Sequence, residues 1–142
     1  MKSLKEYLLE EKNNIPNKLY HATIRQRLNS IKKLGLGSKI PKNRLWDYKG
    51  TEYENIKQGF FCDIDPVNAY DYIASSDEIW DKYEDFDEER DIIVFEIDTK
   101  DMDLSKLSID TNNQDNEEDI TSYFYDGVIP FEKLKKISTA GF

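Results

Sequence analysis

One run of eight residues constrains the fold more than any other part of the chain. Residues 91–98 read Asp-Ile-Ile-Val-Phe-Glu-Ile-Asp, so β-branched and aromatic side chains fill most of the space between two aspartates. Such a run suits an extended strand that is buried on both faces. The sequence therefore predicts a strand here in the interior of a sheet, which other strands and helices must cover.

Two strand-to-helix units are predicted before this run. Residues 18–21 form the first strand, and apolar side chains at helical spacing follow it, with Thr23 placed to cap the helix and Gly35 to end it. Residues 59–62 form the second strand, after which Asp65-Pro66 supplies an N-cap and a first-turn proline. Together with the buried run, these units indicate an α+β fold with short strands and short helices.

The remaining segments are predicted to be surface and connecting structure. Residues 37–58 lack a clean period and are expected to form a long loop. Residues 77–91 are dominated by carboxylates and are expected to form an acidic surface helix or loop. Residues 110–119 form an acidic loop, residues 122–130 alternate aromatic side chains around the turn dipeptide Asp126-Gly127, and residues 131–137 close the chain.

The N-terminal segment is predicted to be an appendage of a single domain. Residues 1–12 carry an amphipathic helical pattern, and turn-forming residues end it before the first strand. The expected division is a helical leader and linker over 1–17 and one domain over 18–142. The chain of 142 residues has the usual size of a single domain with its own core.

Composition excludes several classes of function. The formal net charge of -9 argues against a general electrostatic grip on nucleic acid. The charge is uneven, because residues 1–50 hold 12 basic and 4 acidic side chains (net +8), whereas residues 51–142 hold 8 and 25 (net -17). One cysteine, Cys62, and one histidine, His21, fall short of a disulfide or a zinc ligand set, so no metal is expected. The sequence also lacks the run of roughly 20 apolar residues that a membrane span needs, which favours a cytoplasmic protein.

Three segments follow one another in an order typical of one family. The first is Leu19-Tyr20-His21-Ala22-Thr23, followed by a predicted helix and Leu34-Gly35-Leu36; the second is Gly59-Phe60-Phe61-Cys62-Asp63, leading to Ala69-Tyr70-Asp71-Tyr72. The third is residues 123–130, Tyr-Phe-Tyr-Asp-Gly-Val-Ile-Pro. In this order they resemble the ADP-ribosyltransferases, in particular the histidine-tyrosine-glutamate branch that includes poly-ADP-ribose polymerases and diphtheria-like toxins.

The resemblance implies a split arrangement of mixed or antiparallel sheets with short helices, and NAD as cosubstrate. Cleavage of the bond between nicotinamide and ribose builds positive charge on the ribose, so the site must fix NAD and place a carboxylate nearby. By resemblance, His21 bonds a ribose hydroxyl, the backbone of Ala22 pairs with the nicotinamide amide, and Thr23 bonds the other ribose. Tyr72 stacks on the nicotinamide ring. The implied NAD pocket comprises Tyr20, His21, Ala22, Thr23, Phe60, Tyr70 and Tyr72, with His21, Tyr72 and Asp126 as the catalytic candidates.

The third segment departs from the family pattern at the catalytic glutamate. That residue falls at Ser122 or Phe124 by spacing, and neither is a carboxylate. Asp126 or Asp119 is the available substitute. Related transferases that move a phosphate from RNA work without the glutamate and use basic residues instead, for which Arg25, Arg27 and Arg44 are loose candidates.

Plainer interpretations stay open for the same residues. Tyr70 and Tyr72 are equally compatible with core packing, Phe60 fits a core position better than a ligand site, and Cys62 is expected to be inert. The leader resembles those of proteins packaged in tailed-phage heads, where cleavage follows a pattern such as Leu8-Leu9-Glu10.

The sequence thus predicts an NAD-dependent mono-ADP-ribosyltransferase-like phage or prophage protein that acts on a host protein in the host cytoplasm. The alternative is a non-catalytic phage protein. It would sequester a nucleotide, bind a target through its acidic face, or be packaged in the virion.

Overall fold

The structure is a computed structural model, and it describes residues 15–38, 57–110 and 121–142. The predicted helix over 1–12, most of the loop over 37–58 and most of the acidic loop over 110–119 lie outside these residues. The strands of the described part are β1 (Lys18–Ile24), β2 (Phe60–Asp63), β3 (Ile92–Asp98), β4 (Leu107–Ile109), β5 (Ser122–Tyr125) and β6 (Leu134–Ile137). The helices are α2 (Leu28–Leu34), α3 (Pro66–Ala74), α4 (Asp77–Lys82) and α5 (Glu88–Asp91), with short 3₁₀ helices that include η1 (Arg25–Arg27) and η5 (Phe131–Lys133).

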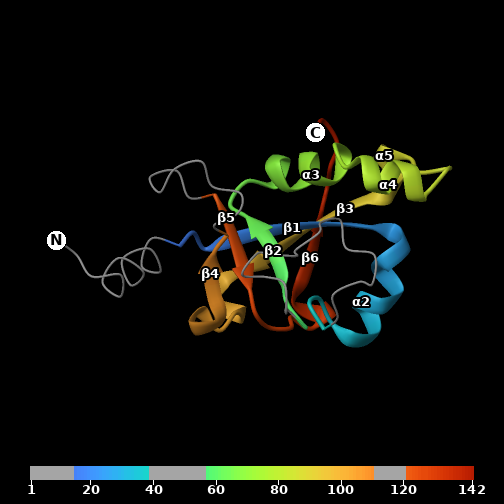
Figure 1. Cartoon of the computed structure of the whole chain (residues 1–142). Coiled ribbons are helices and arrows are strands. Elements are labelled where there is room, and N and C mark those ends of the chain that lie inside the picture. The colour runs from blue at the N-terminus through green and yellow to red at the C-terminus, as the bar shows by residue number, and fades with distance from the viewer. Residues whose placement is uncertain (1–14, 39–56, 111–120) are drawn as a thin grey trace, which may run out of the picture.

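Within the described part, six strands form one sheet in the order β4-β5-β2-β1-β3-β6, and all neighbouring strands are antiparallel (Figure 1). The predicted α+β class is confirmed. β3 lies between β1 and β6 and is buried over most of its length, which confirms the interior strand that residues 91–98 predict. No helix among the described residues has the length and apolar character needed to cross a bilayer.

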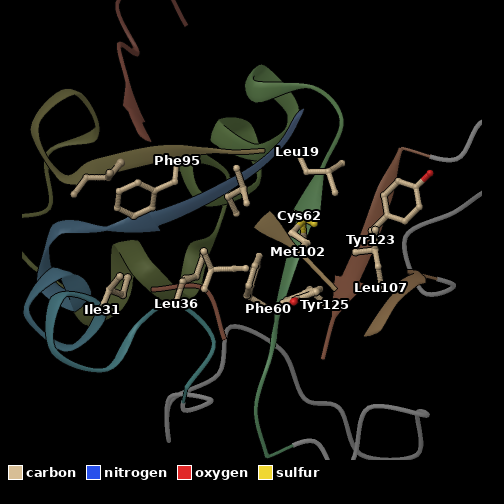
Figure 2. Packing of buried hydrophobic residues seen from close by; sticks show 13 residues of the cluster. Leu19, Ile31, Leu36, Phe60, Cys62, Phe95, Met102, Leu107, Tyr123 and Tyr125 are labelled. Atoms are coloured by element: carbon tan, nitrogen blue, oxygen red, sulfur yellow. The ribbon is translucent and has the colours of Figure 1, made fainter. Parts of the chain in front are cut away.

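The sheet packs apolar side chains on both of its sides. Because side chains alternate along a strand, β1 and β3 contribute to two clusters. Leu19 and Phe95 belong to the larger one, which extends beneath β2, β5 and β4 (Figure 2). Ala22 and Val94 belong to the second cluster, which α3 covers from the opposite side (Figure 1). The α3 side chains in this second cluster are Ala69, Tyr70 and Ile73.

The first strand-to-helix unit differs from the prediction at its junction. β1 continues to Ile24, because it pairs with β3 along its whole length, from Lys18 with Asp98 to Ile24 with Ile92. Thr23 is therefore a buried strand residue, and the prediction that it caps a helix is wrong. Gly35 does end α2, with a φ of +85° that a side chain would disfavour.

The second unit follows the prediction closely. Asp65 caps α3 by accepting a hydrogen bond from the backbone N–H of Val67 at 2.8 Å, and Pro66 occupies the first turn. The acidic segment after it contains two short helices, α4 and α5. Ile79 and Phe86 anchor this segment to the second cluster, so its carboxylates lie on an otherwise packed element.

The two last strands, β5 and β6, do not pair with each other. β5 lies between β4 and β2, whereas β6 pairs with β3 at the opposite edge of the sheet. The predicted turn at 126–127 therefore does not join neighbouring strands. The connection is anchored by Ile129, which is buried and forms an isolated antiparallel bridge with Leu36 after α2.

Candidate functional site

His21 lies where two parts of the sheet meet. Of the described residues in β1 and β2, Tyr20 and Asp63 form the one register pair between these strands, whereas β1 pairs with β3 at seven positions. Beside this pair, Nδ1 of His21 is 2.6 Å from the backbone oxygen of Phe61 in β2. A carbonyl oxygen only accepts, so Nδ1 carries the proton and donates it. The imidazole thus takes part in joining β2 to β1.

The hydrogen bond to Phe61 determines the protonation state of Nε2, the other ring nitrogen of His21. Burial, opposed by the Phe61 carbonyl and aided by the positive charge of Arg27, lowers the pKa of His21 to about 4. The ring is therefore neutral at pH 7. With the proton held on Nδ1, Nε2 presents a lone pair. His21 can accept a hydrogen bond from a hydroxyl or an amide at this nitrogen.

Aromatic rings support the imidazole from β2. The ring of Phe60 lies 5.2 Å from that of His21, centroid to centroid, at an angle of 70°. Phe60 in turn contacts Tyr125 of β5 at 5.6 Å. Phe60 is buried in the larger cluster, in keeping with the core interpretation, and it also forms one wall around His21. Cys62 is buried in the same cluster, and burial raises the pKa of its thiol, so it stays protonated.

The residues around His21 in β1 divide between the two sides of the sheet. Ala22 and Thr23 are buried and pair with Val94 and Ile93 of β3. Tyr20 is half-buried against the second cluster, and burial together with the charge of Glu96 raises the pKa of its phenol. These neighbours of His21 therefore have their positions set by β3.

The two α3 tyrosines differ in their surroundings. Tyr70 is 5% exposed within the second cluster, and the ring of Phe142 lies 5.6 Å from it. Its surroundings are those of a core residue. Tyr72 is half-buried against the same cluster, which also contains Ala22 of β1. Tyr72 is thus associated with the α3 side of the sheet, whereas the Phe60 ring that contacts His21 belongs to the other side.

The positions expected for a catalytic carboxylate are occupied as follows. Ser122 is buried, and its hydroxyl donates to Oδ2 of Asp110 at 3.0 Å. Phe124 is buried with its ring 4.9 Å from that of Phe61. Asp126 is exposed and accepts a hydrogen bond from the side chain of Gln58 at 3.1 Å. Asp119 lies outside the described residues.

Asp110 is a buried carboxylate that the sequence interpretation missed. It is 1% exposed, although the sequence places it at the start of a polar, acidic loop. Its backbone N–H donates to the oxygen of Ser122, which continues the β4–β5 ladder by one residue. The available signal was the alternation of Leu107 and Ile109 immediately before it.

The three arginines that were candidates for a basic site have different surroundings. Arg25 pairs with Asp91, Nε to Oδ1, at 2.8 Å, so it has a structural partner. Arg27 is half-buried and close enough to His21 for its charge to lower the pKa of the imidazole. Arg44 lies outside the described residues. In the part of the chain that is described, no group of three or more histidine, cysteine, aspartate or glutamate side chains could hold a metal ion.

Comparison with known proteins adds no family to this geometry. No protein-family model matches the chain, and it has no significant match among curated proteins or solved structures.

Proposed function

We propose that the chain is an NAD-dependent mono-ADP-ribosyltransferase, or a close relative with impaired turnover, that modifies a host macromolecule. The observation that carries the proposal is the state of His21, a neutral ring whose Nδ1 donates to Phe61 and whose Nε2 is left as an acceptor. This is the state needed to accept a hydrogen bond from a ribose hydroxyl. The order of the three sequence segments supplies the link to NAD.

In this proposal each candidate residue has a definite task, although Tyr70 and Tyr72 lie on the α3 side of the sheet and Phe60 lies on the other side. His21 holds the nicotinamide ribose, and the backbone of Ala22 holds the nicotinamide amide. Tyr72, with Phe60 or Tyr70 as helper, stacks on the nicotinamide ring. Thr23 and Tyr20 complete the pocket on β1. The carboxylate that would stabilise the developing cation comes from Asp126 or Asp119, because Ser122 and Phe124 occupy the usual position.

The test is transfer of label from labelled NAD to proteins of a host-cell lysate. His21→Ala and Tyr72→Ala are each expected to reduce transfer by about tenfold or more, since each removes a contact to the reacting end of NAD. Tyr72→Phe is the matched control, because it keeps the ring and removes only the hydroxyl. Absence of both label transfer and NAD cleavage in every sample, wild type included, would contradict the proposal.

A second candidate is a binder that holds NAD or a related nucleotide without turning it over. It is favoured by Ser122 and Phe124 at the expected glutamate position and by the exposure of Asp126. Calorimetric titration separates the candidates, because binding of NAD without release of nicotinamide supports the binder.

Packaging in a phage particle is a further possibility, which rests on the pattern Leu8-Leu9-Glu10. Mass spectrometry of purified particles tests it. Absence of the protein from the particles would end that idea.

A further inference from the structure

The surface around α4 carries carboxylates that form no ion pairs with described residues, although the charge of Arg90 acts on Asp85. Asp77, Glu78, Asp81, Glu84 and Asp85 are all exposed, and none of them forms an ion pair with any described residue. The carboxylates along the sheet, in contrast, form ion pairs. Glu96 contacts Lys18 and Lys135, Asp98 contacts Lys18 and Lys100, and Asp101 contacts Lys133.

The two basic side chains of the acidic segment 77–91 contact groups other than the carboxylates around α4. Arg90 donates to the buried carboxylate of Asp91 at 2.9 Å, and to the backbone oxygen of Asp85 at 3.0 Å. The ammonium group of Lys82 lies over the ring of Tyr83, 5.4 Å from its centroid. The segment therefore presents a net negative field to solvent at close range.

A large apolar side chain is fixed in the middle of this field. Trp80 of α4 is 42% exposed, in contrast to its neighbour Ile79, which is 1% exposed and anchors the helix. The indole N–H donates to the backbone oxygen of Ala74 at 2.8 Å, and the ring meets Phe86 edge-on at 4.9 Å. A partner that covers Trp80 would thus meet a ring that is already held in place, at little cost in side-chain entropy.

We propose that this face is a docking site for a basic segment of a partner protein, rich in lysine and arginine. We define the Trp80 surface as Trp80 with Asp77, Glu78, Asp81, Glu84 and Asp85. Charge complementarity selects the occupant: the unpaired carboxylates attract cations, and an exposed indole face binds ammonium and guanidinium groups. The same field repels nucleic acid and acidic proteins. The inference is independent of the proposed transferase activity, since Trp80 and His21 belong to different parts of the fold.

The test uses the full chain carrying Trp46→Phe, which leaves Trp80 as the one tryptophan whose fluorescence reports binding. The probe is a short synthetic peptide of alternating lysine and arginine with blocked ends. We expect saturable binding that weakens with salt. Trp80→Ala, followed by peptide anisotropy, should raise the Kd about tenfold. Asp81→Asn should raise it about twofold to threefold.

Glu132→Gln is the matched control, because it removes one exposed carboxylate from η5, elsewhere on the protein. It should leave the Kd within the error of the wild type. Trp80→Phe, which keeps an aromatic ring, guards against misfolding of the alanine variant and should bind more tightly than Trp80→Ala.

Three outcomes overturn the proposal. One is no binding at low salt. The second is equal weakening by Glu132→Gln and Asp81→Asn, which would mean diffuse attraction to an acidic protein. The third is a self-associated chain, detected by sedimentation velocity, that Trp80→Ala dissociates; the occupant would then be a second copy, through its basic residues 1–50.

Discussion

Arg25 and Asp91, which are 66 positions apart in the chain, form an ion pair of 2.8 Å in which the carboxylate has no exposed surface. Arg90 and the backbone N–H of Asp87 donate to the same carboxylate. The group therefore ties the end of β1, through η1, to α5 and the start of β3. These donors hold the pKa of Asp91 well below its usual range, even though burial opposes the shift.

Replacement of Asp91 by asparagine is expected to destabilise the protein by about 2 kcal/mol. The amide cannot accept from all these donors, and two guanidinium groups lose their countercharge. Both arginines are about half exposed, which limits the loss because water can solvate them. Urea unfolding at neutral pH measures the change. Asp81→Asn on the exposed face of α4 should change stability little, and an equal loss there would refute this role of Asp91.

Stability is expected to fall between pH 7 and pH 5 because of His21. Its pKa is about 4 in the folded chain and 6.5 as an ordinary value, so the unfolded state binds the proton over this range and the folded state does not. The resulting loss is about 2 kcal/mol at pH 5. His21→Gln cannot titrate, so the comparison of its urea midpoints at the two pH values with those of the wild type isolates this group. Equal pH dependence in both proteins would contradict the prediction.

Gly59→Ala is expected to lower stability by about 2 kcal/mol or more. Gly59 has a φ of +109°, and a Cβ there would lie 2.4 Å from the backbone oxygen of Tyr125 and 2.5 Å from the ring of Phe124. Gly141→Ala is the matched control, because its φ is +85° but a Cβ would meet no atom within 4 Å. Thermal unfolding should show a clearly larger drop in Tm for Gly59→Ala. Similar drops for both variants would mean that backbone strain alone is responsible.

Local sequence signals predicted the elements that short-range physics decides. The interior strand β3 follows from its own β-branched run, and the start of α3 follows from Asp65 and Pro66. Gly35 at the end of α2 is a local requirement of the backbone as well. In each case, the deciding contact lies within a few residues of the signal.

The features that the sequence did not predict depend on contacts between distant residues. Thr23 is a residue type that often caps helices, but pairing with Ile93 holds it in β1. β4 has three residues, too few for a period, and exists because β5 pairs with it. Asp91 is one of many carboxylates in its segment, and only the fold brings Arg25 to it.

The candidate site is also only partly predictable from the sequence. His21 was found from its flanking motif, but its tautomer depends on the carbonyl of Phe61, 40 positions away, and its lowered pKa depends on burial by the fold. The buried pair of Asp110 and Ser122 joins two strands whose register no short window of sequence determines.

The hydrogen bond from His21 to Phe61 has a mechanical consequence. Within the described residues, one half of the sheet (β4-β5-β2) is joined to the other half (β1-β3-β6) through the Tyr20–Asp63 pair. The imidazole of His21 adds a hydrogen bond between the two halves beside this pair. A side-chain hydrogen bond between strands can be altered by protonation of the side chain or by a ligand. A backbone hydrogen bond between strands cannot be altered in this way. A ligand that binds His21, or a proton added to its ring, would therefore act on a residue that helps to attach the two halves of the sheet to each other.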